Sequence, residues 1–254
     1  MADALSPRSA STPPDRAPNT LSKRRALAEL ILGYVLILLV IWTPRTVQRP
    51  LYILTIIVIA AIFYAGFTSA ASMGLRTTNF LRSLWIVVLA AILSAISIAL
   101  AIHFRTLHPT HGPIAFFKRY WGYALWSFVQ QILLQDFFFR RLQLLIPSAT
   151  IAAVAAALVF SIAHIPSPVL TIVTFAFGLA ACLLFLRYRN LYPLAIAHAI
   201  LGITIAITLP NAVIHNMRVG LGYLTFTHHH HRSHSDQVVS TSACVIAEAP
   251  TRRS

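Results

Sequence analysis

Asp136 is the only carboxylate side chain in the long stretch of chain between Glu29 and Asp236. Over the whole sequence 57% of the residues are hydrophobic and only 10% are charged, whereas soluble domains carry about 25% charged residues. A chain with so few charges has too little polar surface to cover a core in water. The sequence therefore predicts a polytopic membrane protein.

The apolar residues gather in runs of the length that a helix needs to cross a bilayer, which is about 20 residues. Backbone groups in lipid must find hydrogen-bond partners within the protein, and a helix satisfies them inside one segment. We therefore expect an all-α fold, a polytopic transmembrane helix bundle with about seven spans, at 26–43, 51–72, 83–104, 121–146, 150–164, 170–186 and 191–209.

The composition changes at both ends of this apolar region. Residues 1–22 are rich in Ser, Pro, Ala and Thr and are expected to be disordered. Three N-terminal transmembrane helices are expected in 23–114, and a membrane domain of four helices in 115–210. The remainder, 211–254, is interpreted as a polar, disordered tail, and its histidine tract at 228–231 as non-catalytic.

The net charge of +14 comes from basic residues spread over tails and short loops. Basic residues at helix ends are typical of membrane topology and of contact with anionic lipid, so we expect the lipid bilayer as a partner and no nucleic acid. Lysine and arginine are more numerous on the N-terminal side of the spans. This bias predicts a multi-pass protein of the cell membrane with a cytoplasmic N-terminus.

A polar stripe interrupts the fourth expected span. Asp136 lies one helical turn before Arg140, and Gln131 and Gln135 share that helix face. A charged group at the bilayer centre costs about 2.5–3.5 kcal/mol on insertion scales. It is retained where it has a partner, a wet cavity or a catalytic role. The plain alternative is that Asp136 only neutralises Arg140.

Two histidines, His164 and His198, lie on other expected helices. Facing Asp136, they would line a single wet cavity. A carboxylate and two imidazoles can bind a divalent metal such as zinc, or position a water for attack on a peptide bond. The three are thus possible metal ligands, with no cofactor certain. Alternatively, His164 lies at the membrane interface and His198 makes only an interhelical hydrogen bond.

Three short motifs follow one another in this region. Residues 135–140 have the spacing of a Glu-Glu pair followed by three residues and Arg, residues 160–164 read Phe-x-x-x-His, and residues 198–202 overlie His-x-x-x-Asn. In this order, over about residues 115–210, they resemble the type II CAAX prenyl endopeptidase family, also called the CPBP or Abi family of intramembrane proteases.

The resemblance implies a membrane-embedded catalytic cavity that contains Gln135, Asp136, Arg140, His164 and His198. Three positions depart from the family's pattern. Gln135 replaces the glutamate that acts as general base, and an amide cannot accept a proton from water. Asp136 replaces the second glutamate and is one methylene shorter. Gly202 replaces the asparagine, which removes a possible oxyanion donor.

The sequence leaves three functions open. The first is an intramembrane endopeptidase that cleaves membrane-associated peptides with an activated water. Asp136 would then serve as base or metal ligand, oriented by Arg140, while the histidines hold the water and stabilise the oxyanion. The second is a catalytically inactive member that acts as a membrane binding or scaffold protein. The third is a small proton-coupled transporter, which the lack of an internal repeat disfavours.

Overall fold

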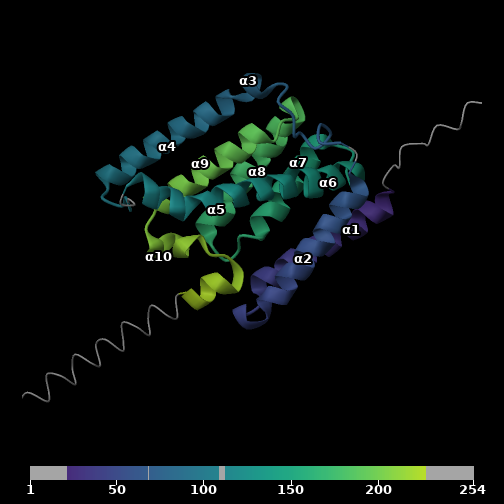
Figure 1. Cartoon of the computed structure of the whole chain (residues 1–254), viewed down its shortest axis with the longest axis horizontal. Helices are drawn as coiled ribbons and strands as arrows, with labels where there is room; N and C mark the ends of the chain where they lie inside the picture. Colours follow the sequence, from purple (N-terminus) through teal and green to yellow (C-terminus); the bar gives the residue numbers. More distant parts are fainter. Residues whose placement is uncertain (1–21, 68, 109–111, 227–254) are drawn as a thin grey trace, which may run out of the picture.

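The computed structural model describes residues 22–67, 69–108 and 112–226, and both expected disordered tails lie largely outside this range. The described residues form helices and their connections, without a strand. The expected all-α helix bundle is therefore confirmed. Figure 1 shows a hairpin of two long helices, α1 and α2, lying along one side of a body made by the remaining helices.

The hairpin consists of α1 (Lys23–Trp42) and α2 (Arg45–Gly66). The Ser22 side chain caps α1 by accepting a hydrogen bond from the Arg25 backbone N–H. A short α3 (Phe80–Ser83) leads into α4 (Trp85–His103), which packs along α9 (Tyr192–Thr208) on the far side of the body.

The centre of the body is one nearly continuous helical path followed by a hairpin. The path comprises α5 (Pro113–Ile132), the π-helix η1 (Leu133–Phe139) and α6 (Arg140–Leu145). The hairpin comprises α7 (Ala149–Ile162) and α8 (Pro168–Tyr188), which pack closely together. Alanines of α7 with no exposed surface allow this approach, at Ala152, Ala153, Ala156 and Ala157.

The helix expected at 121–146 differs from the observed path in one respect that matters for the site. It begins earlier, at Pro113, and its polar stretch is π-helical. A π-helix bonds residue i to residue i+5, and the Arg140 backbone N–H accordingly bonds to the Gln135 carbonyl. The regular 3.6-residue spacing assumed for the polar stripe is therefore wrong from Leu133 onward.

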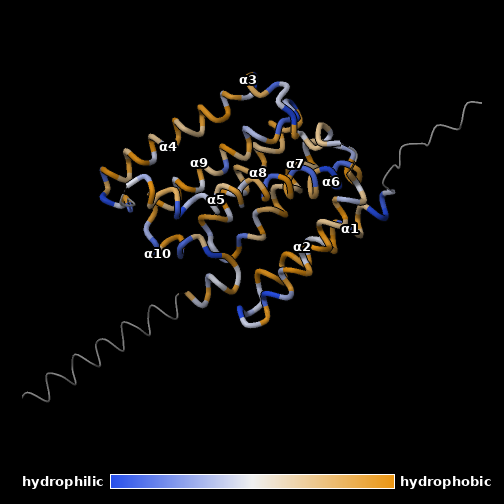
Figure 2. The backbone as a smooth tube through the Cα atoms, viewed as in Figure 1, coloured by the Kyte–Doolittle hydropathy of each residue, from blue (hydrophilic) through white to orange (hydrophobic). Residues whose placement is uncertain are grey.

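Within the described residues, four helical segments are long and apolar enough to cross a membrane, at Lys23–Trp42, Arg45–Gly66, Phe80–His103 and Pro168–Tyr188. Figure 2 shows them as mostly hydrophobic along their length. Large apolar side chains of α1, α2 and α4 point outward, which suits lipid and not water, including Ile31, Leu32, Ile53, Ile57, Val88 and Ile96. The chain is thus a multi-pass membrane protein, while the number of seven spans stays a prediction.

The C-terminal segment contradicts one expectation. A polar tail was expected from residue 211, yet α10 (Asn211–Ile214), the 3-10 turn η2 (His215–Met217) and a further helical stretch at 220–226 follow. Ile214 is 1% exposed, and the Gly220 N–H donates to the Ile165 carbonyl at 2.9 Å. The segment folds because it carries apolar side chains that pack against the bundle.

Candidate functional site

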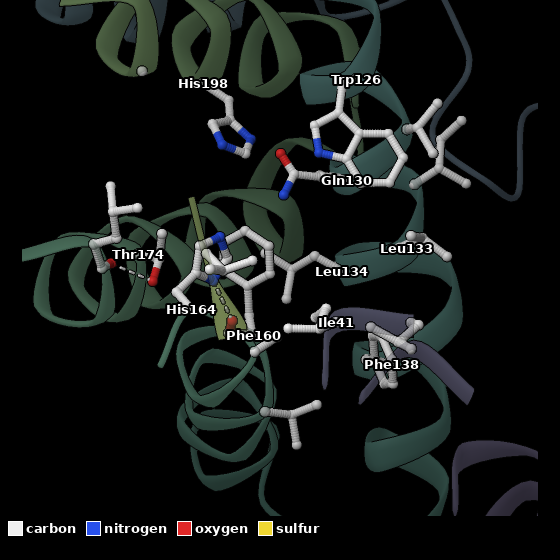
Figure 3. Close-up of a pocket in the computed structure, with 18 of the residues that line it drawn as sticks. Ile41, Trp126, Gln130, Leu133, Leu134, Phe138, Phe160, His164, Thr174 and His198 are labelled. Atoms are coloured by element: carbon white, nitrogen blue, oxygen red, sulfur yellow. Dashed lines mark hydrogen bonds between the residues drawn. The ribbon is translucent and has the colours of Figure 1, made fainter. Parts of the chain in front are cut away.

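The two histidines of the sequence motifs line one large cavity of about 690 Å³. Its walls come from α1, α2, α5, η1, α7, α8 and α9, and the C-terminal segment adds Asn216, Met217 and Val219. Most of the lining is apolar. Figure 3 shows His164, His198 and Gln130 grouped among these apolar side chains.

His164 follows the end of α7, and its ring is held by the backbone of its own helix. The Nδ1 atom lies 2.8 Å from the Phe160 carbonyl oxygen. A carbonyl only accepts, so Nδ1 carries the proton and donates. In the neutral ring, the Nε2 atom is then left as a hydrogen-bond acceptor.

His198 lies on α9 and is held by a side chain from α5. Its Nδ1 atom is 3.2 Å from the Gln131 Nε2 atom. The Gln135 amide nitrogen donates to Gln131 Oε1 at 3.4 Å, which orients the Gln131 amide with its nitrogen toward His198. His198 Nδ1 therefore accepts, and its Nε2 carries the proton.

The two rings share an aromatic neighbour. The Phe160 ring centroid is 5.0 Å from that of His164 and 6.0 Å from that of His198. Phe177 lies against His198 at 4.9 Å. The structure thus brings together two imidazoles with opposite tautomers, one presenting an acceptor at Nε2 and the other a donor.

The acidic motif lies elsewhere. Gln135, Asp136 and Arg140 line a second cavity of about 260 Å³, which shares no lining residue with the first. The expected convergence of Asp136 with His164 and His198 is therefore not found. The physical reason is the π-helix, which changes the direction in which residues after Leu133 point.

This separation also bears on the possible metal. Among the residues that the structure describes, no group of three or more His, Cys, Asp and Glu side chains could hold a metal ion. The expected ligand set of Asp136, His164 and His198 does not fit a zinc site, because zinc sites use at least three protein ligands.

Among the described residues, Asp136 and Arg140 line the same cavity but form no ion pair. Within the described part of the chain, the ion pairs join Glu29 to Arg25 and to Arg141. Arg141 also donates to the carbonyl oxygens of Asp136 at 3.3 Å and Phe137 at 3.0 Å. In the π-helix it is the residue five positions on that lies over Asp136, so Arg141 is buried and Arg140 is exposed.

Two functional candidates were missed or undervalued at the sequence level. Gln130 points into the histidine cavity in Figure 3 and lines it, and Gln131 holds His198. The signal was present as two adjacent amides in an apolar helix. Gly202 also has a structural explanation, because a Cβ atom there would overlap the Tyr123 hydroxyl group. Tyr123 fills the space of the missing asparagine.

No curated protein and no solved structure matches this chain. A family model does match, described as Rce1-like, type II CAAX prenyl endopeptidase Rce1-like, over residues 120–204. The matched segment runs from α5 into α9 and contains every motif residue discussed above. Over residues 120–204 this chain is therefore similar to the Rce1-like, type II CAAX prenyl endopeptidase family.

Proposed function

We propose that this protein is a binding member of the family, which takes a lipid-modified or otherwise apolar peptide tail from the bilayer into the histidine cavity. The observation that carries the proposal is the composition of the cavity wall. It contains two histidines and Gln130, but no Asp or Glu among the described lining residues. Efficient peptide hydrolysis in this family's manner needs such a carboxylate as general base.

The two ring nitrogens suit a peptide group. A peptide group presents one N–H donor and one C=O acceptor. His164 Nε2 can accept the former, and His198 Nε2 can donate to the latter. The apolar walls, with Ile59, Phe63 and Phe138 among them, offer room for the hydrocarbon part of the ligand.

We place the protein in the cell membrane with the N-terminus in the cytoplasm. The support is the excess of lysine and arginine on the N-terminal side of the spans. A membrane-associated peptide would then reach the cavity through the bilayer, between the outward apolar faces of the helices.

The second candidate function, endopeptidase activity, is favoured by the same tautomers. His164 Nε2 is a base that could take a proton from water, and His198 Nε2–H could donate to the oxyanion. However, His164 Nδ1 donates to the neutral Phe160 carbonyl and not to a carboxylate that would stabilise an imidazolium. This arrangement favours binding over rapid turnover.

The test uses the full chain in proteoliposomes with a fluorescent peptide that ends in a farnesylated cysteine and three further residues. Affinity is measured by fluorescence anisotropy and cleavage by mass spectrometry. We expect binding without cleavage by the parent, and about tenfold weaker binding by His164→Ala and by His198→Ala, since one hydrogen bond contributes about 0.5–1.5 kcal/mol. Unchanged affinity in both variants would overturn the proposal.

A matched pair of variants separates the two functions. Gln130→Glu places a carboxylate in the histidine cavity, and Gln135→Glu makes the same chemical change outside it. We expect cleavage to arise in Gln130→Glu and not in Gln135→Glu. Cleavage by the parent that is lost in His164→Ala would establish the endopeptidase instead.

A further inference from the structure

The second cavity is a separate polar site at one end of the bundle. It has a volume of about 260 Å³ and is lined by Ser72, Gln135, Asp136, Arg140, Gln143, Leu144, Phe185 and Arg189. Ser72 lies in the connection after α2, while Leu144 and Arg189 lie at the ends of α6 and α8. Helix ends of a membrane bundle lie at the level of the lipid headgroups.

Two residues that line this cavity carry buried hydrogen-bond acceptors that the protein does not satisfy. Gln135 is 0% exposed and Asp136 is 4% exposed. Gln135 Oε1 and Asp136 Oδ2 are both buried without a hydrogen-bond partner. Buried polar atoms are normally satisfied, and an unsatisfied one calls for an explanation. A ligand that binds both atoms must donate hydrogen bonds to them. Because one of them belongs to a carboxylate, a cationic donor is preferred.

The mouth of the cavity presents the opposite chemistry. Arg140 and Arg189 line the same cavity as Asp136 and are exposed. A guanidinium group only donates and matches phosphate oxygens in a forked geometry. The loop that carries Arg189 is tied down, because Arg76 Nε donates to its carbonyl at 2.9 Å.

We infer that this cavity binds a phosphoethanolamine group, with the ammonium on Gln135 Oε1 and Asp136 Oδ2 and the phosphate between Arg140 and Arg189. An ammonium has three N–H donors for the two acceptors, and a phosphate has enough oxygens for two arginines. The headgroup of phosphatidylethanolamine contains this group. A free phosphoethanolamine carries the same chemistry.

The experiment measures binding to the full chain purified in detergent. Thermal unfolding is followed with O-phosphoethanolamine, O-phosphocholine, ethanolamine, glycine and inorganic phosphate. Native mass spectrometry measures retention of phosphatidylethanolamine, phosphatidylcholine and phosphatidylglycerol. We expect preference of at least tenfold for the phosphoethanolamine compounds, because a trimethylammonium has no N–H to donate and phosphatidylglycerol has no amine.

Arg140 and Arg189 are exposed, so replacing either one is not expected to disturb folding. Arg140→Gln and Arg189→Gln are each expected to weaken binding about tenfold. Arg187→Gln is the matched control, because Arg187 is also an exposed arginine but does not line the cavity. Asp136→Asn is expected to abolish the preference for an amine while leaving an interaction with phosphate.

The outcomes are distinct. Retention of phosphatidylethanolamine without a thermal shift by the soluble compound assigns a lipid, and the reverse assigns a free ligand. Either of these two results supports the proposed phosphoethanolamine site. Equal retention of the three lipids together with no soluble binding overturns it and leaves a water-filled cavity, and a larger shift with glycine overturns it in favour of an amino acid. Because Arg140 and Arg189 do not line the histidine cavity, the effects of their variants are distinguishable from loss of peptide binding.

Discussion

Arg141 binds Glu29 across two helices, with Nη2 at 2.8 Å and Nε at 3.0 Å from the same carboxylate oxygen. The Arg141 Cζ atom also lies 4.1 Å from the centroid of the Phe137 ring. The Arg141 side chain is 7% exposed and the Glu29 side chain 12%. This largely buried pair attaches α1 of the N-terminal hairpin to α6, directly after the π-helix.

Removing the carboxylate of this pair is expected to destabilise the fold. Glu29→Gln leaves Arg141 buried without its counter-charge, and breaking a buried pair costs about 3 kcal/mol or more. Arg25→Gln is the control, because Arg25 binds the same carboxylate at 2.7 Å with a side chain that is 48% exposed. Exposed pairs contribute about 0–1 kcal/mol. Thermal unfolding in detergent measures the loss of stability in each variant. Equal losses would show that the buried pair contributes no more stability than the exposed pair.

Restoring the family's asparagine is expected to fail on its own. In Gly202→Asn the new Cβ atom overlaps the Tyr123 side chain, and overpacking costs about 1–3 kcal/mol. Tyr123→Ala removes the obstacle, so the double variant should be more stable than the sum of the single effects predicts. A double-mutant cycle of unfolding temperatures checks this. Strict additivity would contradict the close approach of Tyr123 to Gly202.

A second glycine allows α1 to approach the π-helix. A Cβ atom at Gly33 would overlap the Phe137 ring, and that ring also contacts Arg141. We expect Gly33→Ala to lose about 1–3 kcal/mol of stability. Gly122→Ala is the matched control, because nothing lies within 4 Å of a Cβ atom at Gly122. There the change should stabilise helix α5 by up to about 1 kcal/mol. Opposite signs in the two unfolding shifts are the result to look for.

Gln131 is expected to act as a positioning residue for His198. Gln131→Leu removes the donor to His198 Nδ1, which frees the ring to take the other tautomer and withdraws the Nε2 donor from the cavity. Stability should fall by about 1–3 kcal/mol, the cost of unpaired buried polar groups. Affinity for the farnesylated peptide should fall about tenfold. Gln143→Leu, which removes an amide from the other cavity, should leave that affinity unchanged.

Several features were determined by the sequence alone. The scarcity of charge and the length of the apolar runs predicted an all-α membrane bundle. Apolar runs of this length lie in lipid, where a helix satisfies the backbone hydrogen bonds within one segment. The spacing of Phe160, His164 and His198 pointed to the family and to the cavity, since Phe160 and His198 lie on regular α-helices and His164 comes directly after one. Their side-chain directions follow from a period of 3.6 residues.

The tertiary structure decided which polar groups meet. The stripe of Gln135, Asp136 and Arg140 was placed with the histidines on the assumption of a regular α-helix. The π-helix adds one residue to the turn, and one residue corresponds to a rotation of about 100°. Asp136 therefore turns to a second cavity and Arg141 takes the buried position beside Glu29. Such a rotation depends on packing against α1, with Gly33 against Phe137 and Glu29 against Arg141, and these contacts join residues more than a hundred positions apart that no local pattern relates.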